Sequence, residues 1–566
     1  MTNIDNLQKT INEWKVSQID ETLKKELMEM SDEELLDAFY KDLEFGTGGM
    51  RGIVGVGTNR MNIYTLRKAN YGYACYLKGV SKKALSVVIA YDCRNMSLEF
   101  AKESACVLAH YGIKVYLFNK ITPTPELSFA VRYLKASGGI VVTASHNPPK
   151  YNGYKIYDAD GCQLIPELAD IVIKNIENAP NPLTMELESF EALEKEGKVV
   201  WLDENIDDEY LKCVKSISVN EVNKDNFKVC FTPLHGTSYI LGPKLLQEMG
   251  YKYTLTAEQM IPDPKFSTLI LPNPEDKKAF DLSIKYAKEN NCDICIATDP
   301  DADRVGLAVK DKNGEYVLLT GNQTGALLIY YLCNYRKVDK KGVIFNTIVT
   351  SPLGVKIGDS FGLEHYSTLT GFKFIGEQAK KLENNSEKMF YFGYEESYGY
   401  VIKDFVRDKD SLQALLLCSE MACFYKNQGK SLLDVLEEVY QKYGYYVEDL
   451  VNINLEGLDG ARRIERILNK FRELKDIEGL NISAKEDYQL STKLDYKTLE
   501  VGKLDLPKSN VIKYFLEDGG FFVLRPSGTE PKMKLYISVA SDSKEESIKK
   551  KELIKETIMK IIDMVE

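Results

Sequence analysis

Short apolar runs alternate with longer amphipathic segments along most of the chain, and this rhythm repeats. In its first part, residues 85–90 and 114–118 are apolar runs of strand length, with helix-like segments between them. Residues 228–232 begin a second series, and residues 342–346 and 388–392 belong to a third. The alternation predicts β-α-β units around mainly parallel sheets, and we therefore expect three related α/β domains with mixed sheets.

The pattern changes after about residue 445. Residues 519–525 and 533–539 are apolar runs on either side of a Pro-Ser-Gly-Thr loop, which predicts two adjacent strands. A capping box at Ser543 and Glu546 predicts the start of a final helix. The apolar stripe expected on that helix consists of Ile548, Leu553, Ile558, Ile562 and Val565. These features predict a smaller α+β domain at the C-terminus.

The length of the chain supports a division into several domains. At 566 residues the chain is too long for one hydrophobic core and predicts about four domains. Residues 4–45 are charged and helical in pattern, with a capping box at Ser31 and Glu34. The expected domains are residues 1–207, 208–322, 323–445 and 446–566.

Composition and charge narrow the class of protein. Apolar residues make up 44% of the chain and charged residues 28%, which are ordinary values for a soluble globular protein. The net charge of -11 argues against broad binding to nucleic acid or an anionic membrane, because both need a basic face. The start of the chain lacks the apolar core of a signal peptide, and no apolar run is long enough for a membrane span. Eleven scattered cysteines are typical of reduced thiols, and Cys292 with Cys295 lacks the second pair of a zinc site. We expect a cytoplasmic protein.

One serine stands at the tip of a tight polar loop that follows an apolar strand. The loop runs from Thr143 to Pro148 and contains Ser145. A serine beside Asn-Pro can be a plain turn hydroxyl. It can also be a nucleophile or phosphoryl carrier, and as a phosphate it would bring a charge of about -1.5 to -2. His146 and Lys155 lie near Ser145 in sequence and could offset that charge or move protons.

A second apolar strand, residues 294–298, leads into Asp299, Asp301 and Asp303 at alternate positions. If this loop is extended, the three carboxylates project to the same side and surround one point. Magnesium takes about six oxygen ligands, which three carboxylates, a phosphoryl oxygen and water would supply. Arg304 suits a phosphate better than a calcium ion, so we expect it to contact substrate. The alternatives are a solvated acidic turn, a calcium loop that lacks the Gly and distal Glu of an EF-hand, and a phosphatase-like aspartate nucleophile.

Two further polar segments could contact a ligand. Residues 45–52 are too rich in glycine for a regular element and suit a close approach of the backbone to a ligand. Glu395 and Ser397 follow a strand of the third series and offer partners for sugar hydroxyls.

The loop of the C-terminal domain begins with Arg525 and continues with Ser527, Gly528 and Thr529. Arginine binds phosphate through two parallel hydrogen bonds, so this loop is a candidate phosphate cradle. A β-turn with incidental charge is the alternative. In open α/β sheets ligands bind beyond the carboxyl ends of strands, and all these loops could therefore face one cleft.

Taken in this order, the serine loop, the Asp-x-Asp-x-Asp-Arg loop, the Glu-x-Ser loop and the Arg-Pro-Ser-Gly-Thr loop resemble those of the α-D-phosphohexomutase superfamily. The resemblance runs from about residue 45 to about residue 539. Further stretches resemble the branch that holds bacterial α-phosphoglucomutases, animal phosphopentomutase and glucose-1,6-bisphosphate synthase. They are residues 44–52, 232–237, 370–374 and 408–410.

The resemblance implies a four-domain, heart-shaped α/β enzyme with one loop from each domain around a central cleft. Ser145 would match the phosphoserine of the family. Its magnesium ligands, for one ion per chain, would be Asp299, Asp301, Asp303 and phosphorylated Ser145. Arg51 and Lys155 match positions proposed for charge stabilisation or proton transfer. The matching substrate contacts are Glu395, Ser397, Arg525, Ser527, Gly528 and Thr529, followed by Thr370, Gly371, Lys373 and Lys409.

The resemblance also implies a reaction. Phosphorylated Ser145 would pass its phosphoryl group to glucose 1-phosphate, and the resulting glucose 1,6-bisphosphate would turn, rephosphorylate Ser145 and leave as glucose 6-phosphate. Glucose 1,6-bisphosphate is then both intermediate and activator, and sugar phosphates are the expected partners. The alternatives are a phosphopentomutase, a phosphomannomutase and a bisphosphate synthase that uses 1,3-bisphosphoglycerate. A non-catalytic relative would be expected to lose the serine or an aspartate, and this chain keeps all four.

Overall fold

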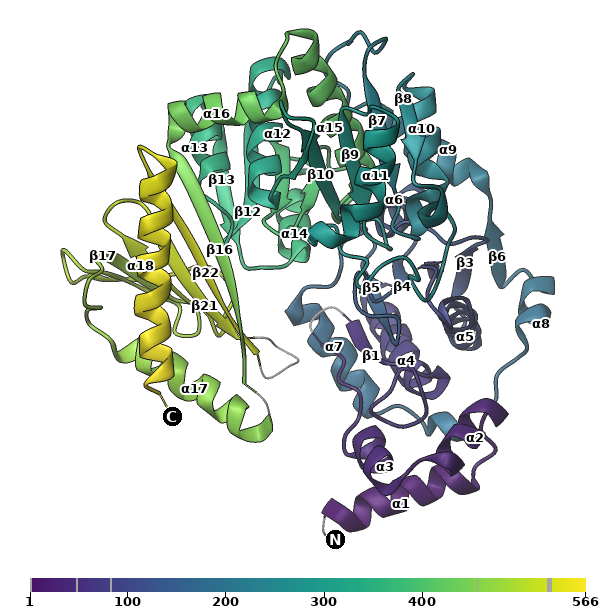
Figure 1. Ribbon diagram of the computed structural model, residues 1–566. Helices are drawn as coiled ribbons and strands as arrows, with labels where there is room; N and C mark the ends of the chain where they lie inside the picture. Colours follow the sequence, from purple (N-terminus) through teal and green to yellow (C-terminus); the bar gives the residue numbers. More distant parts are fainter. Residues whose placement is uncertain (1–2, 47–48, 82–83, 456, 527–531, 566) are drawn as a thin grey trace. The chain divides into compact units, whose positions relative to one another are not determined.

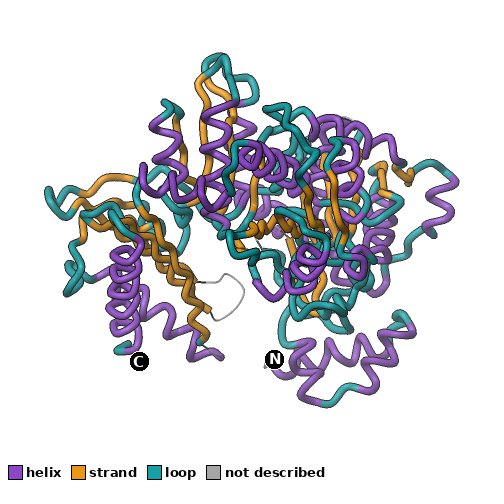
Figure 2. The backbone as a smooth tube through the Cα atoms, turned by 45° about the horizontal axis from the view of Figure 1, so that its top comes forward, coloured by secondary structure: helices purple, strands orange, loops and turns teal. Residues whose placement is uncertain are grey.

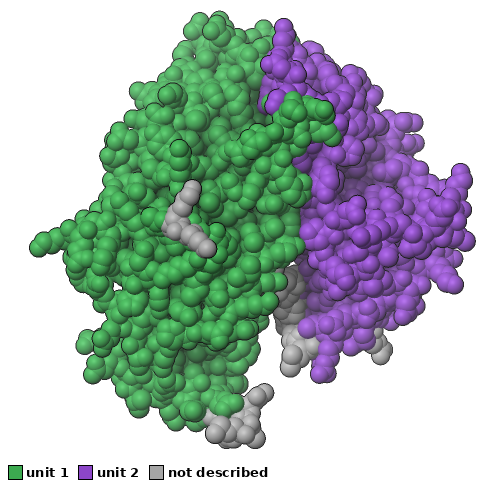
Figure 3. Space-filling view, turned by 180° about the vertical axis from the view of Figure 1, so that it is seen from behind, with its two compact units in different colours: residues 1–321, 372–429 green, residues 322–371, 430–566 purple. Residues whose placement is uncertain are grey.

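A computed structural model of the protein describes residues 3–46, 49–81, 84–455, 457–526 and 532–565. The chain forms two compact units (Figure 3). Unit 1 holds residues 1–321 and 372–429, and unit 2 holds residues 322–371 and 430–566.

Three helices precede the first sheet of unit 1 (Figure 1). They are α1 (Asn3–Val16), α2 (Glu21–Glu29) and α3 (Asp32–Phe39). The predicted capping box is confirmed, because Ser31 accepts from the Glu34 amide and Glu34 reaches back to the Ser31 amide. The helices enclose a small core in which the Trp14 ring meets Phe39 and Tyr64 edge to face.

The first sheet of unit 1 is mixed and six-stranded, in the order β1-β5-β4-β2-β3-β6. Its strands are β1 (Gly49–Ile53), β2 (Ser86–Tyr91), β3 (Lys114–Phe118), β4 (Gly138–Val142), β5 (Tyr151–Tyr157) and β6 (Val199–Leu202). Strands β2, β3, β4 and β6 are parallel, whereas β5 runs antiparallel to β4 and β1. The helices of this region are α4 (Ile63–Val80), α5 (Ser97–His110), α6 (Thr124–Tyr133), α7 (Pro166–Glu177), α8 (Phe190–Lys195) and α9 (Glu204–Lys215).

The second sheet of unit 1 has five strands in the order β11-β10-β9-β7-β8. They are β7 (Lys228–Thr232), β8 (Lys252–Leu255), β9 (Ile294–Thr298), β10 (Val305–Lys310) and β11 (Tyr316–Leu318), with helices α10 (Leu241–Glu248) and α11 (Asp281–Glu289). All five residues of β9 are buried. A central strand that is covered on both faces has a continuous apolar sequence, as β9 does. The aspartate loop follows the carboxyl end of this strand.

The remaining α/β elements are divided between the units. Unit 1 contains α14 (Phe372–Leu382), the antiparallel strands β14 (Lys388–Glu395) and β15 (Gly399–Val401), and α15 (Ser411–Asn427). Unit 2 contains α12 (Gly321–Tyr335) except its first residue, the parallel strands β12 (Lys341–Thr347) and β13 (Glu364–Thr368), α13 (Leu353–Ser360) and α16 (Leu432–Tyr443).

Unit 2 ends in an antiparallel seven-stranded sheet in the order β16-β22-β21-β20-β17-β18-β19. The strands are β16 (Tyr445–Asn454), β17 (Ile482–Asp487), β18 (Thr492–Asp495), β19 (Val501–Lys503), β20 (Ile512–Leu516), β21 (Phe521–Pro526) and β22 (Lys532–Ser541). Helices α17 (Gly457–Glu473) and α18 (Lys544–Asp563) pack against this sheet around one core (Figure 2). The predicted pairing of the two strands that flank the Pro-Ser-Gly-Thr loop is confirmed.

The apolar stripe predicted for α18 is partly wrong. Ile548 and Leu553 are 40% and 51% exposed, whereas Ile554, Ile558 and Ile562 are buried. The buried residues are four apart, which keeps them on one helix face, whereas a spacing of five turns the side chain away from it.

Candidate active site

Ser145 lies in a tight turn three residues after the end of β4. Its backbone is left-handed, with φ 52°, and its amide donates to Thr143 Oγ1 at 2.8 Å. The Asn147 amide closes the turn on the Ala144 carbonyl at 3.1 Å. The turn buries Ser145, which is 4% exposed, and aims its hydroxyl at the aspartate loop.

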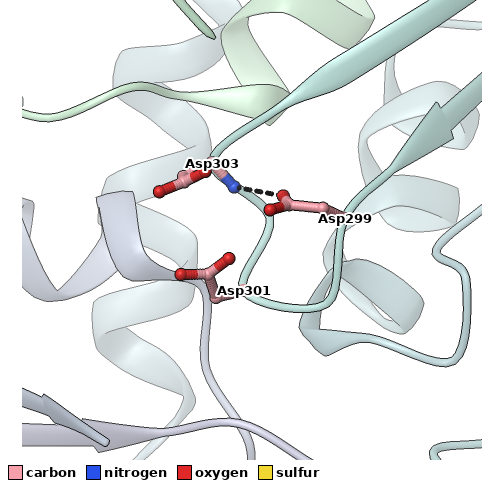
Figure 4. A group of neighbouring side chains, drawn as sticks. All are labelled: Asp299, Asp301 and Asp303. Atoms are coloured by element: carbon pink, nitrogen blue, oxygen red, sulfur yellow. Dashed lines mark hydrogen bonds between the residues drawn. The ribbon is translucent and has the colours of Figure 1, made fainter. Parts of the chain in front are cut away.

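The aspartate loop is a turn and not the extended segment expected from the sequence. The Ala302 amide donates to the Asp299 carbonyl at 2.9 Å, and Ala302 is left-handed with φ 55°. Asp299 Oδ1 accepts from the amides of Asp303 at 3.0 Å and Arg304 at 2.9 Å. The three carboxylates therefore converge because the chain curls around them, as Figure 4 shows, and not because alternate residues share a face.

The serine loop and the aspartate loop meet inside unit 1. Ser145 Oγ donates to Asp299 Oδ2 at 2.8 Å and lies 3.1 Å from His146 Nδ1. Burial, and then the nearby cations Arg304 and Arg51, hold the pKa of His146 well below its usual value, so the imidazole is neutral. A hydroxyl, a neutral base and a carboxylate thus share one buried space.

Asp299, Asp301 and Asp303 fit a hard divalent cation. One oxygen from each carboxylate lies within 4.8 Å of the others, and no other such group of three occurs in the part of the chain that the structure describes. Burial first, and then Asp301 and Asp303, raise the pKa of Asp299 well above its usual range. Asp301 Oδ1 and Asp303 Oδ1 are buried without a hydrogen-bond partner among the described residues. A divalent cation would relieve both the repulsion and the missing contacts.

Two lysines contact carboxylate oxygens of this cluster. Lys155, on β5, places Nζ 2.8 Å from Asp301 Oδ2 and 3.5 Å from Asp303 Oδ2. Lys409 places Nζ 3.1 Å from Asp303 Oδ2. Burial lowers the pKa of Lys155, but Asp301 and Asp303 outweigh burial and raise it overall, so this ammonium stays charged.

The two arginines expected near the substrate lie beside these loops. Arg304 directs its guanidinium to Glu275, and its Nε lies 3.9 Å from Asp303 Oδ1. Arg51, on β1, donates to Asn147 Oδ1 at 3.3 Å and is exposed. Arg51 therefore borders the serine loop with a side chain that solvent can reach.

Glu395 and Ser397 lie at the end of β14 in the same unit. Ser397 Oγ donates to Glu395 Oε2 at 3.3 Å. Burial raises the pKa of Glu395 to about 7, although Lys409 opposes the shift. The backbone ties this loop to the strand after the aspartates, because the Val305 amide donates to the Tyr398 carbonyl at 3.0 Å.

The remaining predicted residues lie in other segments of the chain. Thr370 and Gly371 end a segment of unit 2, and Lys373 lies in the first turn of α14 in unit 1. Arg525 lies on β21 in unit 2 and donates to the Tyr536 hydroxyl at 3.4 Å. Ser527, Gly528 and Thr529 lie outside the described residues.

Sequence reasoning missed residues that hold the aspartate cluster. Thr124, at the start of α6, donates its amide to the Asp301 carbonyl at 2.9 Å and its hydroxyl to Asp301 Oδ2 at 3.1 Å. Asp408 accepts from Tyr157 at 2.8 Å and from Lys409 Nζ at 3.2 Å, which orients that lysine. The available signal was the Thr-Pro-Thr-Pro run after β3, which is another polar segment beyond the carboxyl end of a strand.

Family models cover most of the chain. The three alpha/beta/alpha domains of phosphoglucomutase/phosphomannomutase match residues 42–182, 208–314 and 320–443, and the C-terminal domain matches residues 450–555. The chain belongs to the phosphoglucomutase/phosphomannomutase family. The predicted superfamily and the four-domain α/β fold class are thereby confirmed.

Individual relatives agree with this family. Phosphoglucomutase from Staphylococcus aureus (strain MRSA252) is 40% identical over 514 residues, which cover 90% of this chain and 92% of the relative. Phosphoglucomutase from Staphylococcus epidermidis (strain ATCC 35984) is 39% identical over 535 residues, which cover 94% of this chain and 97% of the relative. These relatives support an enzyme of the mutase class that acts in sugar metabolism.

Solved structures show the same fold. The phosphoglucomutase pp63/parafusin from Paramecium, in its open form, matches with a TM-score of 0.69 at 18% identity and covers 93% of this chain and 95% of that one. A putative phosphomannomutase from Thermus thermophilus matches with a TM-score of 0.66 at 23% identity, and the match covers 91% of this chain and 99% of that one. Among the described helices, none combines the length and apolarity needed to cross a membrane.

Proposed function

We propose that this protein interconverts glucose 1-phosphate and glucose 6-phosphate through phosphorylated Ser145 and glucose 1,6-bisphosphate. The observation that carries the proposal is the 2.8 Å contact between Ser145 Oγ and Asp299 Oδ2, inside a cluster of three buried carboxylates. A hydroxyl in that position is a phosphoryl carrier whose phosphate would lie against a divalent cation. The phosphoglucomutase relatives support the choice of glucose.

In the first half-reaction the bond between phosphorus and Ser145 Oγ breaks. A new bond forms between phosphorus and the free hydroxyl oxygen of glucose 1-phosphate, and the proton of that hydroxyl is returned to Ser145 Oγ, which leaves as a neutral hydroxyl. In the second half-reaction Ser145 Oγ attacks the other phosphoryl group of the bisphosphate, and the proton that Ser145 loses is passed to the sugar oxygen as it leaves. His146 Nδ1, 3.1 Å from Ser145 Oγ, supplies a neutral acceptor for the serine proton.

Charge around the transferred group is the second requirement. Asp299, Asp301 and Asp303 would hold one magnesium ion, which neutralises charge on the phosphoryl group when it is bound. Lys155 and Lys409 pair with Oδ2 of Asp301 and Asp303, so Oδ1 of each aspartate would be the oxygen that binds the cation. This assignment is supported by Asp301 Oδ1 and Asp303 Oδ1, which are buried without a hydrogen bond among the described residues.

The substrate contacts remain predictions from the family resemblance. Glu395 and Ser397 would bind sugar hydroxyls and Arg304 the phosphate, whereas Arg51 would stabilise charge or transfer a proton. The distal phosphate site would consist of Arg525, Ser527, Gly528 and Thr529, with Thr370, Gly371 and Lys373 as additional contacts. One such site must accept either end of the sugar, because glucose 1,6-bisphosphate turns between the half-reactions.

Ser145→Ala tests the proposal. The variant should keep the fold and lose at least about 10³-fold in turnover of glucose 1-phosphate, because the phosphoryl carrier is gone. Ser419→Ala is the matched control, since Ser419 is also buried but donates only to Leu415 O in its own helix at 2.7 Å. The measurement is formation of glucose 6-phosphate in a coupled assay with trace glucose 1,6-bisphosphate. Turnover of Ser145→Ala close to that of Ser419→Ala would refute the proposal.

The same assay decides between sugars. We expect glucose 1-phosphate to be turned over faster than mannose 1-phosphate or ribose 1-phosphate. Preference for ribose or mannose would instead identify a phosphopentomutase or a phosphomannomutase. Accumulation of bisphosphate from 1,3-bisphosphoglycerate, with little isomerisation, would identify a bisphosphate synthase.

A further inference from the structure

Arg94 lies beneath the serine loop with a side chain that is 0% exposed. It follows β2 and belongs to none of the motifs that point to phosphoryl transfer. Its guanidinium donates to four backbone carbonyls, three in the serine loop and one at the start of β5. They are Ser145 O at 2.6 Å, Pro148 O at 2.9 Å, Tyr151 O at 3.0 Å, and Asn147 O.

These four carbonyls need hydrogen-bond donors. Ser145, Asn147 and Pro148 lie in the turn between β4 and β5, outside the strand ladder, and Tyr151 is the first residue of β5. Of the turn carbonyls, that of Pro148 also accepts from the Tyr151 amide at 3.1 Å. A buried carbonyl without a donor is costly. A guanidinium offers five N–H donors in one rigid plane, which a lysine ammonium cannot reproduce. Arg94 therefore fixes the whole backbone of the turn from a single point.

The guanidinium is itself held from two sides. Its Nε lies 3.3 Å from Asp92 Oδ2, and Asp92 Oδ1 accepts from Ser97 Oγ at 2.7 Å. The ring of Phe266 lies over the cation, with 5.0 Å between the guanidinium carbon and the ring centroid. Phe266 comes from the segment between β8 and β9, so Arg94 links the serine loop to the region that carries the aspartates.

We infer that Arg94 is a positioning residue for phosphoryl transfer, which sets the place of Ser145 Oγ relative to Asp299 by holding the carbonyls of the serine loop. The inference rests on the proposed function of Ser145. Ser145 has a left-handed backbone that an L-residue adopts at a cost, so the turn needs an external constraint to stay in that conformation. Loosening the turn would move Oγ away from its 2.8 Å contact with Asp299 Oδ2.

Arg67 provides a matched control. It is another poorly exposed arginine of unit 1, which donates to the carbonyls of Pro182 at 2.9 Å and Met185 at 3.3 Å and to Glu103 at 2.6 Å. None of these partners belongs to the serine or aspartate loops. Arg67→Lys and Arg94→Lys therefore both remove guanidinium hydrogen bonds to backbone carbonyls, but only Arg94→Lys removes them from the serine loop.

The test compares these two variants with the wild-type protein. Arg94→Lys should lower kcat with glucose 1-phosphate by about 100-fold, the effect expected when a reacting group is misplaced by about 1 Å. KM for glucose 1-phosphate should change by less than about twofold, because no substrate contact is altered. Intact mass should show a parallel slowing of Ser145 phosphorylation by glucose 1,6-bisphosphate. Amide hydrogen exchange should rise in residues 143–151 of Arg94→Lys and stay unchanged there in Arg67→Lys.

The inference would be overturned if folded Arg94→Lys phosphorylated Ser145 at the rate of Arg67→Lys. If Arg94→Lys does not fold, Phe266→Leu decides, since it removes only the ring that covers the guanidinium. That variant should lower kcat several-fold at unchanged KM, and an unchanged kcat would overturn the inference. Failure of the proposed function gives a different result, because Ser145 would then not be phosphorylated in the wild-type protein either.

Discussion

Glu126 and Asp207 are buried carboxyl groups that lie beside each other in unit 1. Glu126, on α6, is 0% exposed, and neither of its carboxyl oxygens has a hydrogen-bond partner among the described residues when the group is ionised. Asp207, on α9, contacts Lys120 through Oδ2 and leaves Oδ1 without a partner among the same residues. A single proton on Glu126, donated to Asp207, would give one Glu126 oxygen and Asp207 Oδ1 a hydrogen bond.

The charges around Glu126 favour that proton. Burial, and then the negative charge of Asp207, raise the pKa of Glu126 well above its usual range. Lys120 opposes the shift, and Asp410 adds to it. We therefore expect Glu126 to be neutral in the folded protein at neutral pH.

Glu126→Gln tests this expectation through the pH dependence of stability. In the unfolded chain glutamate has a pKa of about 4.3, so above that pH the folded state binds the additional proton. Folding stability from this group is then fully present at low pH and is lost as pH rises through the unfolded pKa toward the folded one, at about 1.4 kcal/mol per pH unit. Glutamine keeps a donor to Asp207 and does not titrate.

Urea unfolding between about pH 5 and about pH 7 measures the difference. The wild-type protein should lose stability relative to Glu126→Gln over this range. Equal pH dependence of the two proteins would show that Glu126 titrates normally.

Single residues also show what a sequence can reveal about a site. Ser145 and the three aspartates lie in loops that follow apolar strands. Their presence in a common site could therefore be predicted from local sequence. Arg94 and Thr124 could not be found that way, because they act on partners 51 and 177 residues away in the chain. Long-range contacts of this kind depend on the packing of whole elements, which periodicity does not encode.

At the scale of elements, the pairing of β5 with β1 controls the serine loop. Gly153 on β5 faces Arg51 on β1, and a Cβ on Gly153 would lie 2.5 Å from Thr143 O and 2.9 Å from Met50 O. Both neighbours are backbone atoms that cannot move without displacing a strand. The position therefore requires glycine for close approach of the chain beside the serine loop.

Gly153→Ala should destabilise the protein by about 1–3 kcal/mol, the usual cost of overpacking. Gly79→Ala is the control, since its Cβ would meet nothing within 4 Å in α4. Alanine is the better helix former, so this change should be neutral or stabilising by up to about 1 kcal/mol. Urea unfolding measures both, and an equal response of the two variants would contradict the close approach at Gly153.

Elements were predicted well where the apolar run is continuous. The runs at residues 114–118 and 228–232 coincide with β3 and β7, because strands buried on both faces have few polar positions inside them. The face of α18 was predicted less well, because apolar residues occur on both sides of that helix and Ile554, Ile558 and Ile562 are the ones that meet the sheet. The aspartate turn was missed because alternating carboxylates suit an extended loop as well as a turn.

At the scale of the whole molecule, unit 1 contains the serine loop, the aspartate cluster, Glu395 and Lys409. The predicted phosphate loop of residues 525–529 belongs to unit 2. The heart-shaped arrangement around a central cleft stays a prediction from the family resemblance, as do the domain boundaries.

Metal removal tests the cluster through stability as well as activity. Magnesium should raise the melting temperature of the wild-type protein, because it binds the folded state and relieves repulsion among buried carboxylates. The melting temperature should rise by at most about 2–4 °C for each kcal/mol of stabilisation, because the shift becomes smaller as the chain becomes longer. EDTA should abolish both the rise and the turnover of glucose 1-phosphate.

Asp301→Asn should remove the magnesium response, whereas Asp208→Asn, at an exposed carboxylate, should keep it. An equal magnesium response in both variants would place the ion elsewhere.

The most direct measurement follows labelled phosphate from glucose 1,6-bisphosphate into the protein and out again. We expect peptide mass spectrometry to find the label on Ser145, and we expect added glucose 1-phosphate to discharge it into sugar as fast as steady-state turnover. Label on another residue, or turnover that continues while the phosphate on Ser145 is retained, would contradict the account.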